Sequence, residues 1–194
     1  MAGDLLIQNA TMVLADRIVE GDLRVTSGSI QTVAAGGGLV ATATEMVIDG
    51  TGLHLLPGAI DPQVHFREPG QPEKEDLGSG SRAAAAGGVT AFLDMPNNNP
   101  VATTRISMDA KIASAAANGV THHGFFIGAT PHNVSDLQSI AGMDGVCGIK
   151  IFMGSSTGDL LVHQQEHLEN IFANTGGIIA THAEDEDRLN ARFA

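Results

Sequence analysis

The segment Gly58-Ala-Ile-Asp-Pro-Gln-Val-His-Phe-Arg-Glu-Pro-Gly70 opens a series of five glycines, each followed by an apolar run typical of a β-strand. The later members of the series are Gly88-Val-Thr, Gly119-Val-Thr, Gly145-Val-Cys and Gly177-Ile-Ile. Three stretches between them are typical of helices, namely Ser79–Ala86, Thr103–Asn118 and Val162–Asn174. Because a strand followed by a helix about every thirty residues is the β/α unit, residues 57–194 predict an α/β fold.

A series of β/α units can close into a barrel or remain an open, doubly wound sheet. A TIM-type barrel usually needs eight units and about 250 residues, whereas five units are visible here. The last residues, Leu189–Ala194, also lie inside a plausible helix. We therefore expect an incomplete TIM-like barrel from a truncated chain, with an open five-stranded sheet as the alternative.

Residues 1–56 follow a different pattern, with short apolar strands separated by turn-forming glycines. The expected strands are Leu5–Leu14, Ile18–Val25 and Ser29–Val33, and Ser27-Gly28 marks a turn. No long helix is expected there. The sequence thus predicts a small β domain over residues 1–56 and an α/β domain over residues 57–194.

Composition excludes several classes of function. The formal net charge is −12, which disfavours nucleic acids and anionic membrane surfaces as partners. The single cysteine, Cys147, precludes an intrachain disulfide, and the N-terminal sequence lacks the features of a signal peptide. No apolar run is long enough to span a membrane. We expect a cytoplasmic protein that acts on a small molecule.

Four stretches carry side chains suited to chemistry at the carboxyl ends of the strands. In the first, Gln63 and His65 share one face of a strand, and Arg67 follows where the strand becomes a loop. In the second, Lys150 lies in the middle of an apolar strand, where burial would lower its pKa and favour the nucleophilic neutral amine. The alternative for Lys150 is a side chain that extends to solvent at the strand end.

The other two stretches place polar residues at neighbouring strand ends. His182 ends an apolar strand and is a candidate metal ligand, because imidazole binds zinc well. Asn97 lies in an Asn-rich loop bounded by prolines, and such loops usually serve only to turn the chain. Since the carboxyl ends of barrel strands form one mouth, we expect these side chains to share an active site.

Taken together, the four motifs resemble those of dihydroorotases in the amidohydrolase superfamily, in order and spacing across nearly the whole chain. The motifs are Asp61–Gly70, Asp94–Asn97, Gly148–Gly154 and Thr181–Glu184. The resemblance implies a β-sandwich segment before the barrel and a centre of one or two Zn²⁺ ions. It also implies reversible hydrolysis of dihydroorotate, a small anionic cyclic amide, to N-carbamoyl-aspartate in pyrimidine biosynthesis.

The resemblance assigns roles to individual residues. It makes His65 and His182 metal ligands, and Lys150 a catalytic, metal-bridging ligand after CO₂ converts it to a carbamate. Arg67 and Asn97 would contact the substrate carboxylate. Gln63 takes the place of the family's first metal-binding histidine, and an amide oxygen is a poorer zinc ligand than imidazole. The family's last histidine ligand and catalytic aspartate belong to later strands, so activity of this chain alone is not expected.

Three other interpretations remain open. His163-Gln-Gln-Glu-His167 fits the His-x-x-Glu-His zinc pattern of some proteases, although five residues match often by chance. A catalytically silent homologue could instead act as a scaffold for a pyrimidine-pathway enzyme or form a homo-oligomer. A third possibility retains the chemistry but changes the substrate to a hydantoin or to allantoin.

Overall fold

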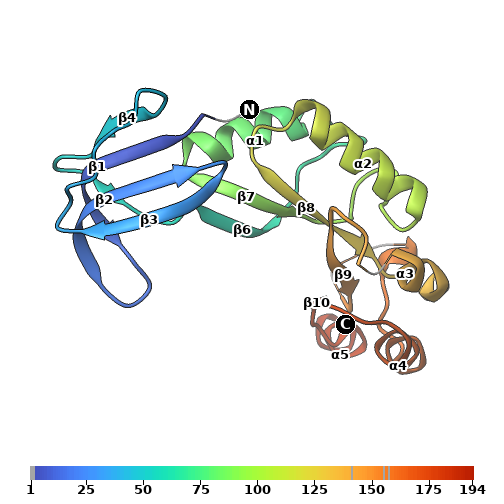
Figure 1. Ribbon diagram of the computed structural model, residues 1–194. Coiled ribbons are helices and arrows are strands. Elements are labelled where there is room, and N and C mark those ends of the chain that lie inside the picture. Colours follow the sequence, from blue (N-terminus) through green and yellow to red (C-terminus); the bar gives the residue numbers. More distant parts are fainter. Residues whose placement is uncertain (1–2, 141, 155, 157) are drawn as a thin grey trace. The chain divides into compact units, whose positions relative to one another are not determined.

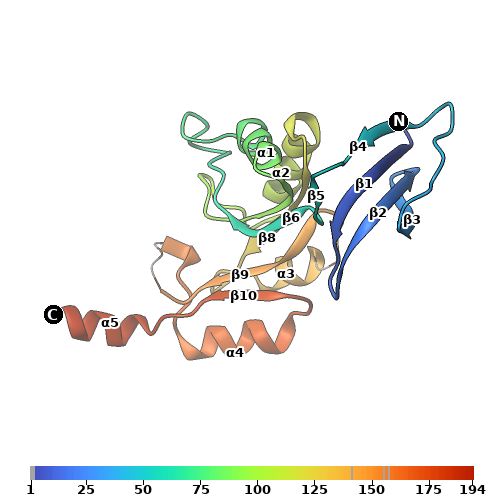
Figure 2. The ribbon, with the colours of Figure 1, turned by 90° about the vertical axis from the view of Figure 1, so that its left-hand side faces the viewer.

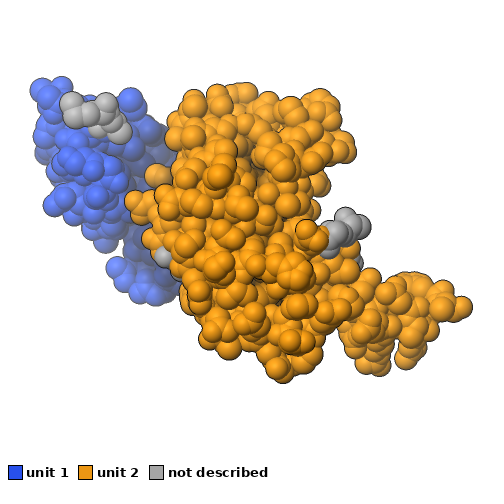
Figure 3. Space-filling view, turned by 90° about the vertical axis from the view of Figure 1, so that its right-hand side faces the viewer, with its two compact units in different colours: residues 1–57 blue, residues 58–194 orange. Residues whose placement is uncertain are grey.

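The structure is a computed structural model that describes residues 3–140, 142–154, 156 and 158–194. The chain separates into two compact units, Met1–Pro57 and Gly58–Ala194, which Figure 3 shows in different colours. The assignment of residues 1–56 and 57–194 to separate domains stays a prediction.

The first unit contains one five-stranded β-sheet with the order β3-β2-β1-β4, and β5 also pairs with β1. The pairs β1–β2 and β2–β3 are antiparallel, whereas β4 and β5 run parallel to β1. Among the residues described up to position 57, all strands belong to this sheet, so they form one layer of the expected sandwich. The strands are β1 Leu5–Val13, β2 Ile18–Thr26, β3 Ser29–Ala35, β4 Met46–Asp49 and β5 His54–Leu55.

A tight turn and a buried carboxylate stabilise the sheet of the first unit. Ser27 and Gly28 have φ angles of 51° and 78°, which form the tight two-residue turn between β2 and β3.

The carboxylate of Asp22 is buried and accepts hydrogen bonds from the backbone amides of Asn9 and Leu39, both at 2.9 Å. These bonds, that from Asn9 first, lower the pKa of Asp22 below its ordinary value.

The second unit alternates strands and helices along the chain (Figure 1). Its strands are β6 Ala59–Val64, β7 Val89–Asp94, β8 His122–Gly128, β9 Val146–Phe152 and β10 Ile179–His182. Its helices are α1 Leu77–Ala86, α2 Arg105–Asn118, α3 Val134–Ile140, α4 Gln165–Asn174 and α5 Glu186–Phe193, with a 3-10 turn at Gly158–Leu160.

The five strands form one parallel sheet in the order β10-β9-β8-β7-β6. Each strand therefore pairs with its neighbours in the sequence, and the order never reverses as it would at the switch point of a doubly wound sheet. This order, together with the curl of the sheet, confirms the predicted incomplete barrel and argues against the open sheet.

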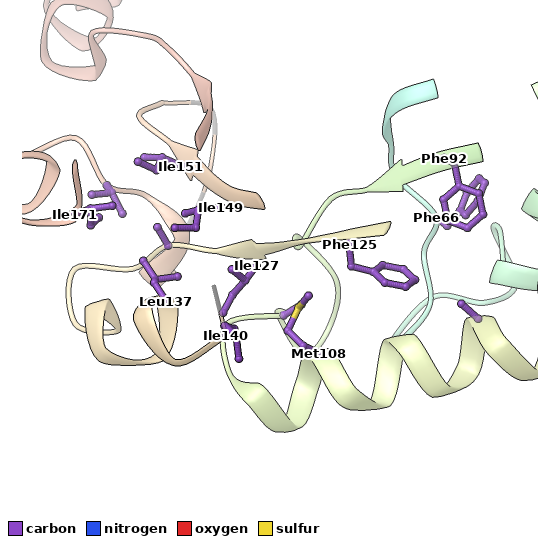
Figure 4. Packing of buried hydrophobic residues seen from close by; sticks show 14 of the residues in the cluster. Phe66, Phe92, Met108, Phe125, Ile127, Leu137, Ile140, Ile149, Ile151 and Ile171 are labelled. Carbon is purple, nitrogen blue, oxygen red and sulfur yellow. The ribbon is translucent and has the colours of Figure 1, made fainter. Parts of the chain in front are cut away.

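One apolar core joins the sheet to α1, α2, α3 and α4 (Figure 4). Because residues from all five strands and these four helices belong to the same cluster, the helices cover one and the same face of the sheet. Figure 2 shows α1 and α2 along β6 and β8, and α4 along β10. We call the opposite face of the β6–β10 sheet the inner face.

Most elements match those expected from the sequence, but β4 and β5 were not predicted, and α4 begins at Gln165 rather than at Val162. The third strand begins at His122, three residues after the glycine that was expected to start it. The short helix α3, seven residues long, was not predicted. Among the described residues, no helix has the length and apolar character needed to cross a membrane.

Candidate active site

Strand alternation places the candidate site residues of β6 and β9 on the inner face. Val64 and Phe66 pack into the helix-side core, so His65 between them points to the inner face, and Gln63 does so two residues earlier. Lys150 likewise lies between Ile149 and Ile151, both of which belong to that core. The sequence prediction that these side chains share a face follows directly from this alternation.

Lys150 is the most unusual of these residues, because only 3% of it is exposed to solvent. Its ammonium lies 5.0 Å from the ring centroid of Phe152. Within the described part of the chain, it has no hydrogen-bond or ion-pair partner. Burial lowers the pKa of the Lys150 amine below its ordinary value. The side chain of Lys150 is therefore buried and does not extend to solvent.

His182 reaches the same region from the neighbouring strand. It pairs in register with Phe152, just as Ala180 pairs with Lys150, so His182 and Lys150 share the inner face. Its ring stacks on that of Phe152, with centroids 6.4 Å apart. Its Nε2 lies 3.3 Å from a carboxylate oxygen of Glu184. Phe152 therefore lies against both Lys150 and His182.

His65 has a different set of contacts, at the other edge of the sheet. Its Nδ1 lies 2.8 Å from Oδ1 of Asn97, and because that oxygen can only accept, Nδ1 carries the proton. Nε2 then carries the free lone pair, which is the arrangement a metal ligand needs. Gln63 is exposed and donates its backbone N–H to the carboxylate of Asp61 at 3.0 Å.

Arg67 follows His65 on a loop fixed by backbone bonds. Its N–H donates to the carbonyl of Glu75 at 2.9 Å, and its carbonyl accepts from Gln71 at 2.8 Å. Its guanidinium has no hydrogen-bonding or ion-pairing partner among the residues the structure describes. A half-buried cation of this kind, two residues after His65 in the sequence, is suited to bind an anionic group.

The structure brings the candidates together as two pairs. His65 contacts Asn97, and Lys150 and His182 share Phe152, but no contact joins one pair to the other within the described residues. These residues also contain no group of three or more His, Cys, Asp or Glu side chains arranged to hold a metal ion. The donors fit a metal centre by their chemistry, because they comprise an imidazole with a free Nε2 and a buried amine without a counter-charge.

The alternative interpretation of His163–His167 as a protease-like zinc motif would need both histidines on one face of a helix. Helix α4 begins at Gln165, so His163 lies before the helix and the shared face of residues four apart does not apply. His163 Nδ1 lies 3.7 Å from Asp187, whereas the ring of His167 meets that of His132 at 6.0 Å. This arrangement argues against a shared zinc ion.

Sequence reasoning missed a buried ion pair beneath the His65 loop. Lys111 Nζ lies 2.6 Å from Oδ2 of Asp94, and both side chains are almost fully buried. Burial lowers the pKa of Lys111 and raises that of Asp94, while their mutual attraction opposes both shifts. A signal was present, because Lys111 has helical spacing with Met108 and Ala115 on the buried face of α2.

Comparison with known proteins identifies the family. A family model described as Dihydro-orotase-like matches residues 52–148, which make up half of the chain. The chain belongs to the dihydroorotase-like family. This membership confirms the resemblance inferred from the four motifs.

The relatives within this family differ in their substrates. Allantoinase of Deinococcus radiodurans is 33% identical over 195 residues, which cover 96% of this chain and 42% of the relative. Dihydroorotase of Halobacterium salinarum is 36% identical over 185 residues, with 92% and 41% covered. The L-hydantoinase structure from Arthrobacter aurescens superposes with a TM-score of 0.85 at 26% identity, covering 98% of this chain and 43% of that one. The chain thus spans about two fifths of the length of these cyclic amidohydrolases.

Proposed function

We propose that this chain supplies part of the active site of a metal-dependent dihydroorotase, which reversibly hydrolyses dihydroorotate to N-carbamoyl-aspartate. The observation that carries the proposal is Lys150, an amine buried in a barrel strand without any described counter-charge. An unpaired buried ammonium is costly, and a structural role would be served better by an apolar residue. A neutral Lys150 can instead attack CO₂ and lose a proton, which yields an anionic carbamate.

Four residues of the inner face would hold the metal. His65 and His182 offer imidazole nitrogens, Lys150 offers carbamate oxygens, and Gln63 offers an amide oxygen. A bound divalent ion such as zinc supplies a Lewis acid that polarises the ring carbonyl and lowers the pKa of water. If His182 holds the ion, its Nε2, which lies 3.3 Å from a carboxylate oxygen of Glu184, would be the nitrogen that faces the metal.

Arg67 favours dihydroorotate over the other cyclic amides. Dihydroorotate carries a carboxylate on its ring, whereas the hydantoin and allantoin rings do not. The guanidinium of Arg67 has two donors that match two carboxylate oxygens, and it has no described protein carboxylate to compete for it. Asn97 uses Oδ1 to accept from His65, which leaves its amide N–H groups for the substrate.

Allantoin or a hydantoin is the second candidate substrate, because an allantoinase is 33% identical to this chain, close to the 36% of a dihydroorotase, and an L-hydantoinase structure superposes with a TM-score of 0.85. A catalytically silent homologue is the third candidate, because the amide oxygen of Gln63 is a poorer metal ligand than an imidazole. Under the proposal the protein acts in pyrimidine biosynthesis, and a homo-oligomer or another enzyme of that pathway is the partner we expect.

The test measures hydrolysis of dihydroorotate, allantoin and hydantoin by this chain joined to the later barrel strands that carry the family's last histidine ligand and catalytic aspartate, with zinc and bicarbonate supplied. We expect activity with dihydroorotate, and we expect Arg67→Met to raise its KM at least tenfold while Arg105→Met, on exposed α2 surface, leaves KM unchanged. A preference for allantoin would support the second candidate. Zinc binding without any hydrolysis would support the silent homologue.

Lys150 allows a separate test in the same protein. Lys150→Met should abolish hydrolysis and yet raise the free energy of unfolding by about 1 kcal/mol, because the folded state no longer has to bury an amine without a polar partner. Urea unfolding measures the second effect. Lys74→Met, at an exposed position, is the control and should change neither quantity. A Lys150→Met protein that retains hydrolysis would refute the assigned role.

A further inference from the structure

The buried pair of Asp94 and Lys111 is connected to the loop after β6 and to the loop after β7. Besides its ion pair, Lys111 Nζ donates to the carbonyl of Met95 at 3.2 Å and to Oδ1 of Asn98 at 2.7 Å. These acceptors all lie at or just beyond the carboxyl end of β7. The ammonium thus has three acceptors in one place and ties the loop after β7 to helix α2.

The same network clamps the peptide at Phe66 from both sides. Oδ1 of Asp94 accepts from the N–H of Phe66 at 3.0 Å. The amide of Asn98 donates to the carbonyl of Phe66 at 3.0 Å and to that of Glu68 at 3.1 Å. The ring of Phe66 is buried against that of Phe92, with centroids 4.7 Å apart. Both backbone groups and the side chain of Phe66 are therefore fixed.

Phe66 is the residue between His65 and Arg67, and Asn98 is the residue after Asn97. Asn98 accepts from the Lys111 ammonium and donates to the Phe66 carbonyl, while Asp94 pairs with that ammonium and accepts from the Phe66 N–H, so the network fixes the distance between the His65 loop and the Asn97 loop. The hydrogen bond from His65 Nδ1 to Asn97 Oδ1, at 2.8 Å, crosses this gap. Its length depends on how the two loops are held.

We propose that Asp94, Lys111 and Asn98 are positioning residues that hold His65 in the tautomer with the proton on Nδ1 and hold Arg67 beside it. The importance of that tautomer rests on the proposed function, in which His65 Nε2 binds the metal. Stability alone is a weak explanation for the pair, because a buried ion pair can often be replaced by apolar residues without loss. A positioning role explains why its hydrogen bonds end on the loops that carry His65, Arg67 and Asn97.

The test uses the double variant Asp94→Asn/Lys111→Met, which removes both charges and leaves neither one unpaired. Asn98→Ala is a milder second variant that keeps the ion pair and removes the bonds to Phe66 and Glu68. The control is Arg24→Met/Glu45→Gln, which removes a partly buried ion pair of the same 2.6 Å length within the first unit. Circular dichroism verifies that each variant is folded.

Two measurements are made on every variant. The first is the ring ¹⁵N chemical shift of His65 at a pH where imidazole is neutral, which reports the tautomer without any metal. We expect the Nδ1-protonated form to dominate in the wild type and in the control, and to lose population in the double variant and in Asn98→Ala. The second is the Kd for Zn²⁺, which we expect to rise 10- to 100-fold in the same two variants.

The outcomes separate this inference from the proposed function. If the double variant and Asn98→Ala are both folded and the His65 tautomer is unchanged in both, the positioning role is overturned, whatever the zinc affinity. A tautomer shift in a protein whose wild type binds no zinc would support the positioning role and contradict the proposed function. A tautomer shift together with weaker zinc binding supports both.

Discussion

Replacement of Phe92 by alanine tests how the core supports the candidate site. Phe92 is fully buried, and its ring meets those of Phe66 at 4.7 Å and Phe125 at 6.4 Å, both in edge-on geometry. A buried Phe→Ala change costs about 3–5 kcal/mol through lost transfer energy and the cavity that remains. About 0.5–1.5 kcal/mol of this loss belongs to the contact with Phe66.

Urea unfolding followed by circular dichroism measures this loss. Phe193→Ala is the matched control, since Phe193 on α5 is 86% exposed and its removal should change the free energy of unfolding by less than about 0.5 kcal/mol. Phe92→Ala should also weaken zinc binding, because Phe66 loses the ring that holds it between the residues of the site. A loss below about 1 kcal/mol for Phe92→Ala would refute the claim that this ring is central to the core.

Two further predictions concern charge and packing. Asp22 has a lowered pKa in the folded state, so it contributes stability above its unfolded pKa of about 3.8 that is lost as the pH falls through the folded value. Asp22→Asn should therefore flatten the acid limb of a stability-against-pH curve, whereas Asp16→Asn, an exposed carboxylate, should not. Gly80→Ala should destabilise by about 1–3 kcal/mol, since the added Cβ would lie 2.5 Å from the Phe66 ring. Gly176→Ala, where nothing lies within 4 Å, should be close to neutral by thermal unfolding, and equal melting temperatures for the two glycine variants would contradict this packing argument.

The barrel-type sheet could be predicted because its signal is local. Each strand needs only a turn-forming glycine and an apolar run, and the repeat of about thirty residues fixes the class of fold. Helix α3 was missed because seven residues give barely two turns of periodicity. The single layer of the first unit could not be predicted, since strand patterns do not show whether a second sheet packs against the first.

The sequence could predict which face of the sheet a candidate side chain points to, because strand alternation determines that direction. Lys150 lies between two core isoleucines, so its inward direction follows from the sequence once the strand is assigned. Its burial to 3% exposure does not follow, because a lysine can also extend to solvent. The roles of Gln63, His65, Arg67, Asn97, Lys150 and His182 stay predictions.

The network of Asp94, Asn98 and Lys111 could not be predicted from the sequence motifs, because its members come from three separate segments. Asp94 ends a strand, Asn98 lies in the loop that follows, and Lys111 belongs to the next helix, so only the packing of α2 against the sheet brings them together. A lysine on the apolar face of α2 nevertheless demands a buried anion, because an unpaired charge there would be too costly. In a strand–helix repeat, that anion has to come from a neighbouring strand end, which is where the side chains of the site emerge. The same rule that led to Lys150, a cation where an apolar residue is expected, would therefore have led to Asp94 and to the loop that carries His65.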